Sequence, residues 1–313
     1  MDNKVKYSIV IPLCNEELVI DELFSRLIRV MELTHEPFEI ICVNDGSVDR
    51  TLDVLKRYSR EDKRIKIISF SNNFGHQVAI TAGLDYSRGE AVIVMDGDLQ
   101  DPPEVIPKLV DKWLEGYEIV HAVREGRKGE AFFKIITSVF FSKLFKIITD
   151  IELPVNVGDF RLLSRKSLDS LNSLKGRHRF VRGFVSSLDY RHTGVTYIRE
   201  RRYLGKTKYS LLKMLRFALD GFTSFSIVPL KIAIYFGIAA YLAISLFLIS
   251  LVLFTIMYPT KHIAGFALFI TSVVFNCGIQ IIIYLLLYEY ISKFYAEIKQ
   301  IPPYFVQEKI GFD

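Results

Sequence analysis

Cysteine is scarce and scattered in this sequence. Its three cysteines, Cys14, Cys42 and Cys277, show no metal-binding spacing, and Cys277 lies inside a long apolar run. A disulfide framework is therefore not expected, and the pattern is typical of a reducing compartment. The start of the chain, MDNKVKYSIVIP, also lacks the apolar core of a signal peptide, and we expect no cleaved leader there.

Glycine is missing where a dinucleotide-binding fold would need it. The turn after the first apolar run has the sequence PLCNEE. A G-x-G-x-x-G turn at this place lets the backbone approach a pyrophosphate, and PLCNEE cannot do so in that way. This absence excludes a nicotinamide-dependent dehydrogenase.

Charged residues are missing from two long stretches near the C-terminus, residues 232–258 and 263–288. Each stretch exceeds the roughly 20 residues that cross the hydrocarbon core of a bilayer. The connector between them is long enough only for a tight hairpin. We therefore expect a two-helix transmembrane hairpin within residues 228–290, followed by a cytoplasmic tail, residues 291–313. Two buried helices of a soluble protein are the alternative.

Basic residues are concentrated before the first apolar stretch. The net charge is +5, but residues 160–231 alone hold sixteen Lys or Arg against four Asp or Glu. Lys293 and Lys299 follow the second stretch, whereas the hairpin tip offers only Lys261. The positive-inside rule predicts that both termini lie in the cytoplasm at the plasma membrane. A basic segment next to a membrane also favours anionic lipid or a phosphate-bearing ligand over a merely solvated face.

The first 125 residues alternate between two hydrophobic periods. Short apolar runs predict strands, and the stretches between them have helical periodicity. This order predicts an α/β fold with a mostly parallel sheet covered on both faces, in which ligands bind at the carboxyl ends of the strands. The expected strands are 7–11, 38–43, 65–70, 91–95 and 118–123, and the expected helices are 17–33, 49–60, 76–87 and 104–115.

Two further segments are amphipathic. Residues 131–148 carry a polar residue at every fourth position of an otherwise Phe- and Ile-rich stretch, and residues 209–225 are basic and precede the first apolar stretch. We expect both to form helices in the membrane interface. For residues 131–148, a buried core helix is the alternative.

Two carboxylates follow the fourth apolar run, in the segment VIVMDGDLQDPP. Side chains two positions apart on an extended strand point the same way, so Asp96 and Asp98 can bind one cation. With the amide of Gln100 as a third ligand, the oxygen donors suit Mg²⁺ or Mn²⁺ better than zinc. A solvated acidic turn that caps the next helix is the alternative.

The ordered motifs identify a family. IPLCNEE, VNDGSVDRT, NNFGHQVAITAGLDYSRG and VMDGDLQDPPE resemble the inverting, family-2 glycosyltransferases of the GT-A fold, the nucleotide-diphospho-sugar transferase fold. With GDFRLL at 158–163, RYLGKTKYS at 202–210 and the apolar hairpin, the chain is similar to polyprenyl-phosphate glycosyltransferases. These include the bactoprenol glucosyltransferases and, more distantly, the dolichol-phosphate mannose synthases. The resemblance covers essentially the whole chain.

The resemblance implies a nucleoside site. Pro12, Glu16 and Asp45 would hold the nucleoside, and Asp45 could accept from the N3–H of a uracil. Two departures from the family pattern bear on this site. Cys14 stands where the family often has tyrosine, and Asn44 replaces the commoner first aspartate of a pair.

The resemblance also implies the residues around the phosphates. Asp96, Asp98 and Gln100 would bind the metal that bridges the donor diphosphate, with Asp98 also counted as catalytic and Gly97 as a substrate contact. Four basic residues would bind donor or acceptor phosphate: Arg124, Arg127, Arg202 and Lys208.

Asp159, in GDFRLL, is the family's candidate base. A phosphate monoester has a second pKa of about 6, so a lipid phosphate is already largely deprotonated at neutral pH. A strong base is therefore hardly needed. Asp159 could instead orient the acceptor phosphate or a sugar hydroxyl, paired with Arg161, and a structural Asp–Arg pair is the alternative.

We therefore expect a metal-dependent, inverting hexosyltransferase in the cytoplasmic domain, residues 1–225. It would move one glucose from UDP-glucose to undecaprenyl phosphate at the cytoplasmic face of the membrane. A mannose synthase using GDP-mannose and an inactive sugar-nucleotide-binding scaffold are the alternatives; a processive synthase would need Q-x-x-R-W, and the single tryptophan, Trp113, lies elsewhere. No nucleic-acid partner is expected. Small residues in the first apolar stretch would let it pack within the hairpin or against a second protomer.

Overall fold

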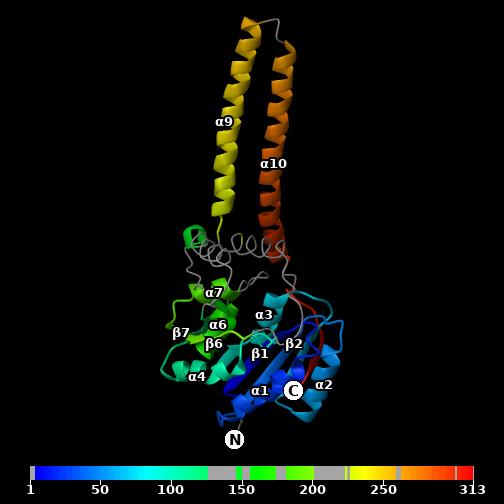
Figure 1. Cartoon of the computed structure of the whole chain (residues 1–313), viewed down its shortest axis with the longest axis vertical. Coiled ribbons are helices and arrows are strands. Elements are labelled where there is room, and N and C mark those ends of the chain that lie inside the picture. The colour runs from blue at the N-terminus through cyan, green and yellow to red at the C-terminus, as the bar shows by residue number, and fades with distance from the viewer. Residues whose placement is uncertain are drawn as a thin grey trace. The chain divides into compact units, whose positions relative to one another are not determined.

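The computed structural model describes residues 4–125, 146–149, 156–173, 181–200, 223, 226–258, 262–299 and 302–312. The chain forms two compact units. One comprises Met1–Met214 together with Ile301–Asp313, and the other comprises Leu215–Gln300. The first unit contains a mixed sheet with helices on both faces, and the second contains two long helices (Figure 1).

The second unit consists of α9 (Val228–Met257) and α10 (His262–Ile298). Both helices are long and apolar enough to cross a membrane, over Val228–Phe254 and Leu268–Tyr295. Only 6% of each apolar window is buried, which argues against the core helices of a soluble protein. A two-helix apolar hairpin is therefore confirmed as a candidate membrane anchor.

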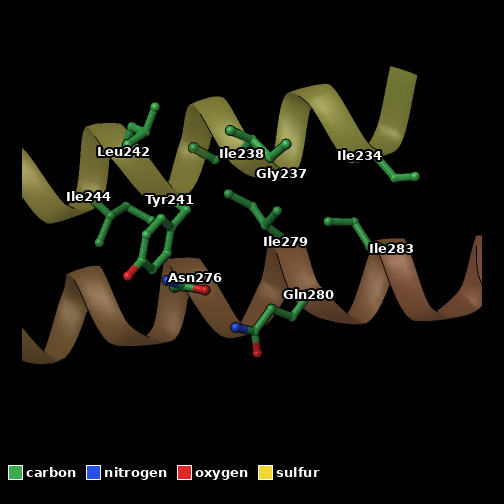
Figure 2. Close-up of a pocket in the computed structure, with 11 residues that line it drawn as sticks. Ile234, Gly237, Ile238, Tyr241, Leu242, Ile244, Asn276, Ile279, Gln280 and Ile283 are labelled. Carbon is green, nitrogen blue, oxygen red and sulfur yellow. The ribbon is translucent and has the colours of Figure 1, made fainter. Parts of the chain in front are cut away.

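The two apolar helices enclose a pocket of about 320 Å³ (Figure 2). Gly237 of α9 lies at this pocket, where a Cβ would press against Ile283 of α10. The lining is apolar apart from Tyr241 and two amides of α10, Asn276 and Gln280. The expected packing of small residues within the hairpin is thus seen at Gly237.

The sheet of the first unit has the strand order β7-β5-β6-β4-β1-β2-β3-β8 in the described residues. The pairs β1–β2, β1–β4, β2–β3 and β5–β7 are parallel, whereas β6 runs antiparallel to β4 and β5, and β8 antiparallel to β3. The predicted α/β fold with a mostly parallel sheet is confirmed. The strands are β1 (Tyr7–Leu13), β2 (Phe38–Asn44), β3 (Ile65–Phe70), β4 (Ala91–Val94), β5 (Ile119–Arg124), β6 (Val157–Ser164), β7 (His192–Tyr197) and β8 (Val306–Ile310).

Helices cover both faces of this sheet. One face packs against α1, α2 and α4, and the other against α3, α6 and α7. The four expected helices are present within a few residues of their predicted bounds. The helices are α1 (Ile20–Glu32), α2 (Thr51–Glu61), α3 (His76–Tyr86), the 3₁₀ turn η1 (Pro103–Val105), α4 (Ile106–Leu114), α6 (Arg165–Ser173) and α7 (Val181–Ser187).

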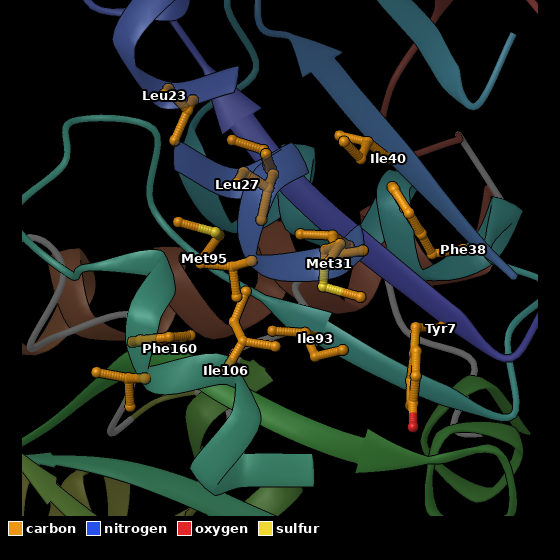
Figure 3. Packing of buried hydrophobic residues seen from close by; sticks show 14 of the residues in the cluster. Tyr7, Leu23, Leu27, Met31, Phe38, Ile40, Ile93, Met95, Ile106 and Phe160 are labelled. Carbon is orange, nitrogen blue, oxygen red and sulfur yellow. The ribbon is translucent and has the colours of Figure 1, made fainter. Parts of the chain in front are cut away.

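The core under α1 shows why the sheet is rigid. Leu23, Leu27 and Met31 project from one face of α1 onto Ile93 and Met95, and all five are fully buried (Figure 3). Burying such a side chain contributes about 1.5–3 kcal/mol. The buried apolar strands therefore form a well-packed core that positions the loops at the carboxyl edge of the sheet.

The end of the chain returns to this sheet. Strand β8 pairs with β3, in the register Ile67↔Ile310 to Phe70↔Val306 with one irregularity. Tyr304 stacks on Phe70 with a centroid distance of 5.0 Å, and Lys56 forms an ion pair of 2.6 Å with Glu308. The expected tail thus contributes a strand that its composition did not predict.

Candidate active site

The polar residues of the site meet at the carboxyl edge of β1, β2 and β4. Strand β6 runs antiparallel to β4 in the register Val94↔Arg161, so its first residues lie beside the turn that follows β4. Asp159 of β6 therefore comes next to Asp96, although the two are far apart in the sequence. The antiparallel pairing of β4 and β6 therefore brings the loop after β4 and the first residues of β6 together in one site.

The turn after β4 does not have the predicted geometry. The strand ends at Val94, and Leu99 has a left-handed backbone with φ of 58°. Asp96 and Asp98 both lie beyond the end of the strand, and Asp98 is in the turn, so the two carboxylates are not two positions apart on one strand. Asp98 accepts a hydrogen bond of 3.2 Å from the N–H of Gln100, which holds this turn closed. Binding of one cation by Asp96, Asp98 and Gln100 stays a prediction.

Gly97 lies in the same turn and packs against β1. A Cβ at this position would overlap Leu13 Cδ2. Close packing against Leu13 therefore favours glycine here. Its predicted substrate contact stays a prediction.

Asp45 follows β2 and holds the start of α3. Its carboxylate is 3% exposed and accepts N–H hydrogen bonds from Phe74 at 2.7 Å and Gly75 at 3.0 Å. Burial raises the pKa of Asp45, and the two backbone donors partly oppose this. Its carboxylate thus has a structural role beside the predicted contact with the base.

Pro12 and Glu16 lie at the end of β1 and in the loop after it. Pro12 pairs in register with Val43 of β2, and the N–H of Glu16 donates to Thr51 Oγ1 at 2.9 Å. They therefore share the edge with Asp45, as the nucleoside prediction requires. Their contact with a nucleoside stays a prediction.

Asp159 is the most heavily paired acid of the site. It is 2% exposed, and Arg182 of α7 donates to both of its oxygens, from Nε at 2.8 Å and from Nη2 at 2.7 Å. Gln77 donates to Oδ2 at 3.1 Å. Burial raises the pKa of Asp159, but Arg182 and His76 outweigh it and hold this pKa well below the usual range. An acid so stabilised as the anion is a weak proton acceptor.

The expected partner of Asp159 was Arg161, and the structure gives this arginine a lesser part. The Arg161–Asp159 ion pair is 3.6 Å long. Arg161 is fully buried and donates instead to the carbonyl oxygens of Gly158 at 2.8 Å and Asp159 at 3.3 Å. The main partner of the Asp159 carboxylate is therefore Arg182.

His76, the first residue of α3, lies between the two acids. Its Nε2 is 3.2 Å from Asp96 Oδ1 and 3.3 Å from Asp159 Oδ2. Burial lowers the pKa of His76, but the two carboxylates outweigh burial and raise this pKa well above its ordinary value. His76 thus has a carboxylate oxygen of each acid within ion-pair distance.

These residues fit a divalent cation at Asp96 better than at Asp159. His76, Asp96 and Asp159 are close enough to share one ion, but both oxygens of Asp159 already accept from Arg182, and a dication would repel that guanidinium. Asp96 Oδ1 is buried, and its one close contact among the described residues is with His76 at 3.2 Å, whose geometry is not that of a regular hydrogen bond. An oxygen ligand of this kind suits Mg²⁺ or Mn²⁺.

Arg124, a predicted phosphate ligand, is held at the end of β5. Its Nη2 donates to Asp101 Oδ2 at 3.2 Å and its Nε to the hydroxyl of Tyr197 at 3.1 Å. Tyr197 in turn donates to Asp101 Oδ1 at 2.5 Å, and Asp101 is completely buried. Arg124 is thus fixed at the same edge as Asp96 and Asp159.

Some predicted residues lie outside the described part of the chain. These are Arg127, Arg202, Lys208, most of the expected interfacial helix 131–148 and nearly all of 209–225. Four residues of the observed site were not singled out from the sequence. His76 and Asp101 stand in quoted motifs at predicted strand ends, whereas Arg182 and Tyr197 carried no signal in a single sequence.

Comparison with known proteins agrees with this geometry. Residues 8–171 match the model of glycosyl transferase family 2, and the chain belongs to this family; it is a glycosyltransferase with a GT-A fold. It is 46% identical to the uncharacterized glycosyltransferase YkcC of Bacillus subtilis, over 100% of this chain and 97% of that protein. It is 36% identical to the prophage bactoprenol glucosyl transferase homolog of Escherichia coli, over 97% and 99% of the two chains.

Among solved structures, the mannosyltransferase PcManGT from Pyrobaculum calidifontis, in complex with GDP-Man and Mn²⁺, is 18% identical at a TM-score of 0.48. The match covers 71% of this chain and 65% of that chain. Similarity at this level supports no inference about ligands.

Proposed function

We propose that this chain transfers a single glucose from UDP-glucose to a polyprenyl phosphate, with inversion at the anomeric carbon. The names of full-length relatives support the acceptor and the sugar, since several at 35% or 36% identity are called bactoprenol glucosyl transferases. The observation that carries the proposal is the site itself. Acids that suit a divalent ion and arginines that suit phosphate meet at one sheet edge, on a chain that also has two membrane-length helices.

The residues suit the charges that this reaction moves. Negative charge builds up on the leaving diphosphate, and a divalent ion held by Asp96, Asp98 and Gln100 would stabilise it there. Arg124, fixed by Asp101 and Tyr197, adds a preorganised positive charge at the same edge. Because Asp159 is held as the anion and the acceptor phosphate is already deprotonated at neutral pH, the attack needs no strong protein base.

The arrangement of the chain supports a membrane-surface enzyme. Met1–Met214 and the strand after α10 belong to one unit. If both helices cross the membrane, the chain therefore returns to the side on which it began. Together with the basic residues before α9, this supports a catalytic domain and both termini in the cytoplasm. The acceptor phosphate would then lie at the level of the lipid headgroups.

The test is transfer of radiolabelled glucose by the purified full-length chain. We expect label in the organic phase with UDP-glucose, Mg²⁺ or Mn²⁺ and undecaprenyl phosphate, and its loss when EDTA removes the metal. GDP-mannose and other nucleotide sugars serve as the panel that tests the donor. Organic-phase label from none of them would reject the proposal and favour an inactive sugar-nucleotide-binding scaffold.

A further inference from the structure

Two arginines pair with the carboxylate of Asp159. One carboxylate lies between two guanidinium groups, Arg182 at 2.7 Å and Arg161 at 3.6 Å. Arginine stays charged at every relevant pH. Asp96 is a second anion in this cluster, since its carboxylate lies within 4.8 Å of that of Asp159.

The two arginines differ in how far a ligand can reach them. Arg161 is 2% exposed and donates to backbone carbonyl oxygens at 2.8 Å and 3.3 Å, so it is closed off from the surface. Arg182 is 34% exposed, and Asp159 holds its guanidinium through two parallel hydrogen bonds. Such a fork removes rotamer freedom before binding, which lowers the cost of forming a contact with a ligand. Arg182 is thus both rigid and reachable.

The position of Arg182 selects the kind of anion. It lies beside Asp159, which is next to Asp96 of the predicted metal turn, and within the segment 160–231, the most basic part of the chain. Arginine matches the oxygens of a phosphate in two-point contacts. We infer that Arg182 binds a substrate phosphate and that Asp159 is the positioning residue that aims it. This rests on the proposed function, in which both substrates carry phosphate.

Kinetics of the full-length chain separate this arrangement from a catalytic base. Arg182→Gln removes the guanidinium, and Asp159→Asn removes the charge that orients it. We expect each to raise the KM for polyprenyl phosphate on the order of 10- to 100-fold, the effect of losing a charge-assisted hydrogen bond. Because both act through one guanidinium, the double variant is expected to be little worse than either single variant. Arg182→Lys should recover part of the loss.

Arg165→Gln is the matched control. Arg165 has similar exposure, 31%, and lies at the other end of β6, where it donates to backbone carbonyl oxygens of Ser87 and Gly89. We expect both KM values of this variant to equal those of the parent. Thermal unfolding of every variant shows whether a loss reflects the site or the fold.

The KM values for the two substrates show which substrate carries the bound phosphate, and they also test the inference. A rise in the KM for UDP-glucose instead assigns the phosphate to the donor diphosphate. Unchanged KM values with a lower kcat, or effects of the two substitutions that multiply, overturn the inference and return Asp159 to the role of base.

A binding experiment keeps the inference testable if no transfer is found. Inorganic pyrophosphate, UDP and polyprenyl phosphate are titrated into the parent and into Arg182→Gln by calorimetry. Weaker binding of at least one probe by the variant supports a phosphate site even without activity. Equal binding of all three probes overturns it.

Discussion

Gly158 leaves room for the guanidinium of Arg124. A Cβ built on this glycine would overlap Nη2 and Cζ of that arginine. The neighbouring side chains of Asp101 and Tyr197 hold Arg124 from its other side. Gly158 and Asp159 thus place two different arginines, Arg124 by leaving space and Arg182 by direct bonding.

Gly158→Ala is expected to lower glucose transfer on the order of tenfold to a hundredfold, because misplacing a positioning group by about 1 Å has effects of that size. The overlapping atoms belong to a side chain, so the substitution is expected to displace the guanidinium of Arg124 and to leave the backbone in place. Transfer rate and thermal unfolding of the variant are measured together.

Gly89→Ala is the control for that experiment. Its Cβ would overlap backbone atoms of Tyr7 and Ser8 at the opposite edge of the sheet, and backbone cannot move aside cheaply. We expect this variant to unfold at lower temperature while the folded fraction keeps its activity. The reverse pattern for the two glycines would contradict the role given to Gly158.

At the scale of elements, the five apolar strands and four helices of the first 125 residues could be predicted, because continuous apolar runs and helical periodicity are local signals. Strand β6 could not. It carries Asp159 and Arg161 among its buried residues. Charged residues interrupt the apolar run by which a buried strand is predicted from sequence. Burial of the Asp159 carboxylate is energetically tolerable because Arg182 of α7 and Gln77 of α3 donate hydrogen bonds to it.

Strand β8 escaped prediction for a different reason. It is short, lies at the edge of the sheet and alternates half-buried with exposed residues. Its sequence, VQEKI, resembles a polar tail unless the free edge of β3 is known. The site residues also differ in how far the sequence predicts them. Asp45, Asp96 and Asp159 lie in recognisable motifs, whereas Arg182 is identified only through its hydrogen bonds to Asp159.

The pairing of β5 with β7 brings together two histidines, whose rings stack with centroids 5.5 Å apart. His121 is 5% exposed. Burial, with smaller effects from Arg161 and His192, lowers the pKa of His121 to about 3. Because the unfolded chain has a histidine pKa of about 6.5, His121 binds a proton more weakly when folded.

The part of the folding free energy that depends on His121 is therefore expected to weaken as pH falls below about 6.5. The contribution of His121 is fully present above that pH and is lost by about 1.4 kcal/mol for each unit down toward pH 3, or about 2 kcal/mol at pH 5. Thermal unfolding of the parent and of His121→Gln between pH 7.5 and 5 measures this. Equal acid sensitivity of the two proteins would contradict the prediction.

At the scale of the whole molecule, the sheet constrains the path through the membrane. The strands before α9 and the strand after α10 share one sheet, so the number of crossings between them must be even. The described helices supply two candidates. A hairpin whose tip alone reaches the far side satisfies both facts.

Cysteine labelling tests this path. The three native cysteines are replaced first, Cys42 by alanine because it is fully buried, and then Thr260→Cys or Asp313→Cys is introduced. In intact cells a membrane-impermeant maleimide is expected to label Thr260→Cys, and to label Asp313→Cys only after permeabilisation. Labelling of both from the same side would rule out the hairpin.

The return of β8 also bears on how the protein is made. The edge of β3 stays unpaired while α9 and α10 are synthesised, because its partner strand β8 follows α10 in the chain. An open edge is a place where strands of other chains can pair. The catalytic domain is therefore expected to be prone to aggregation until the hairpin and β8 have been synthesised. The sheet can be completed only after the membrane segment has been made.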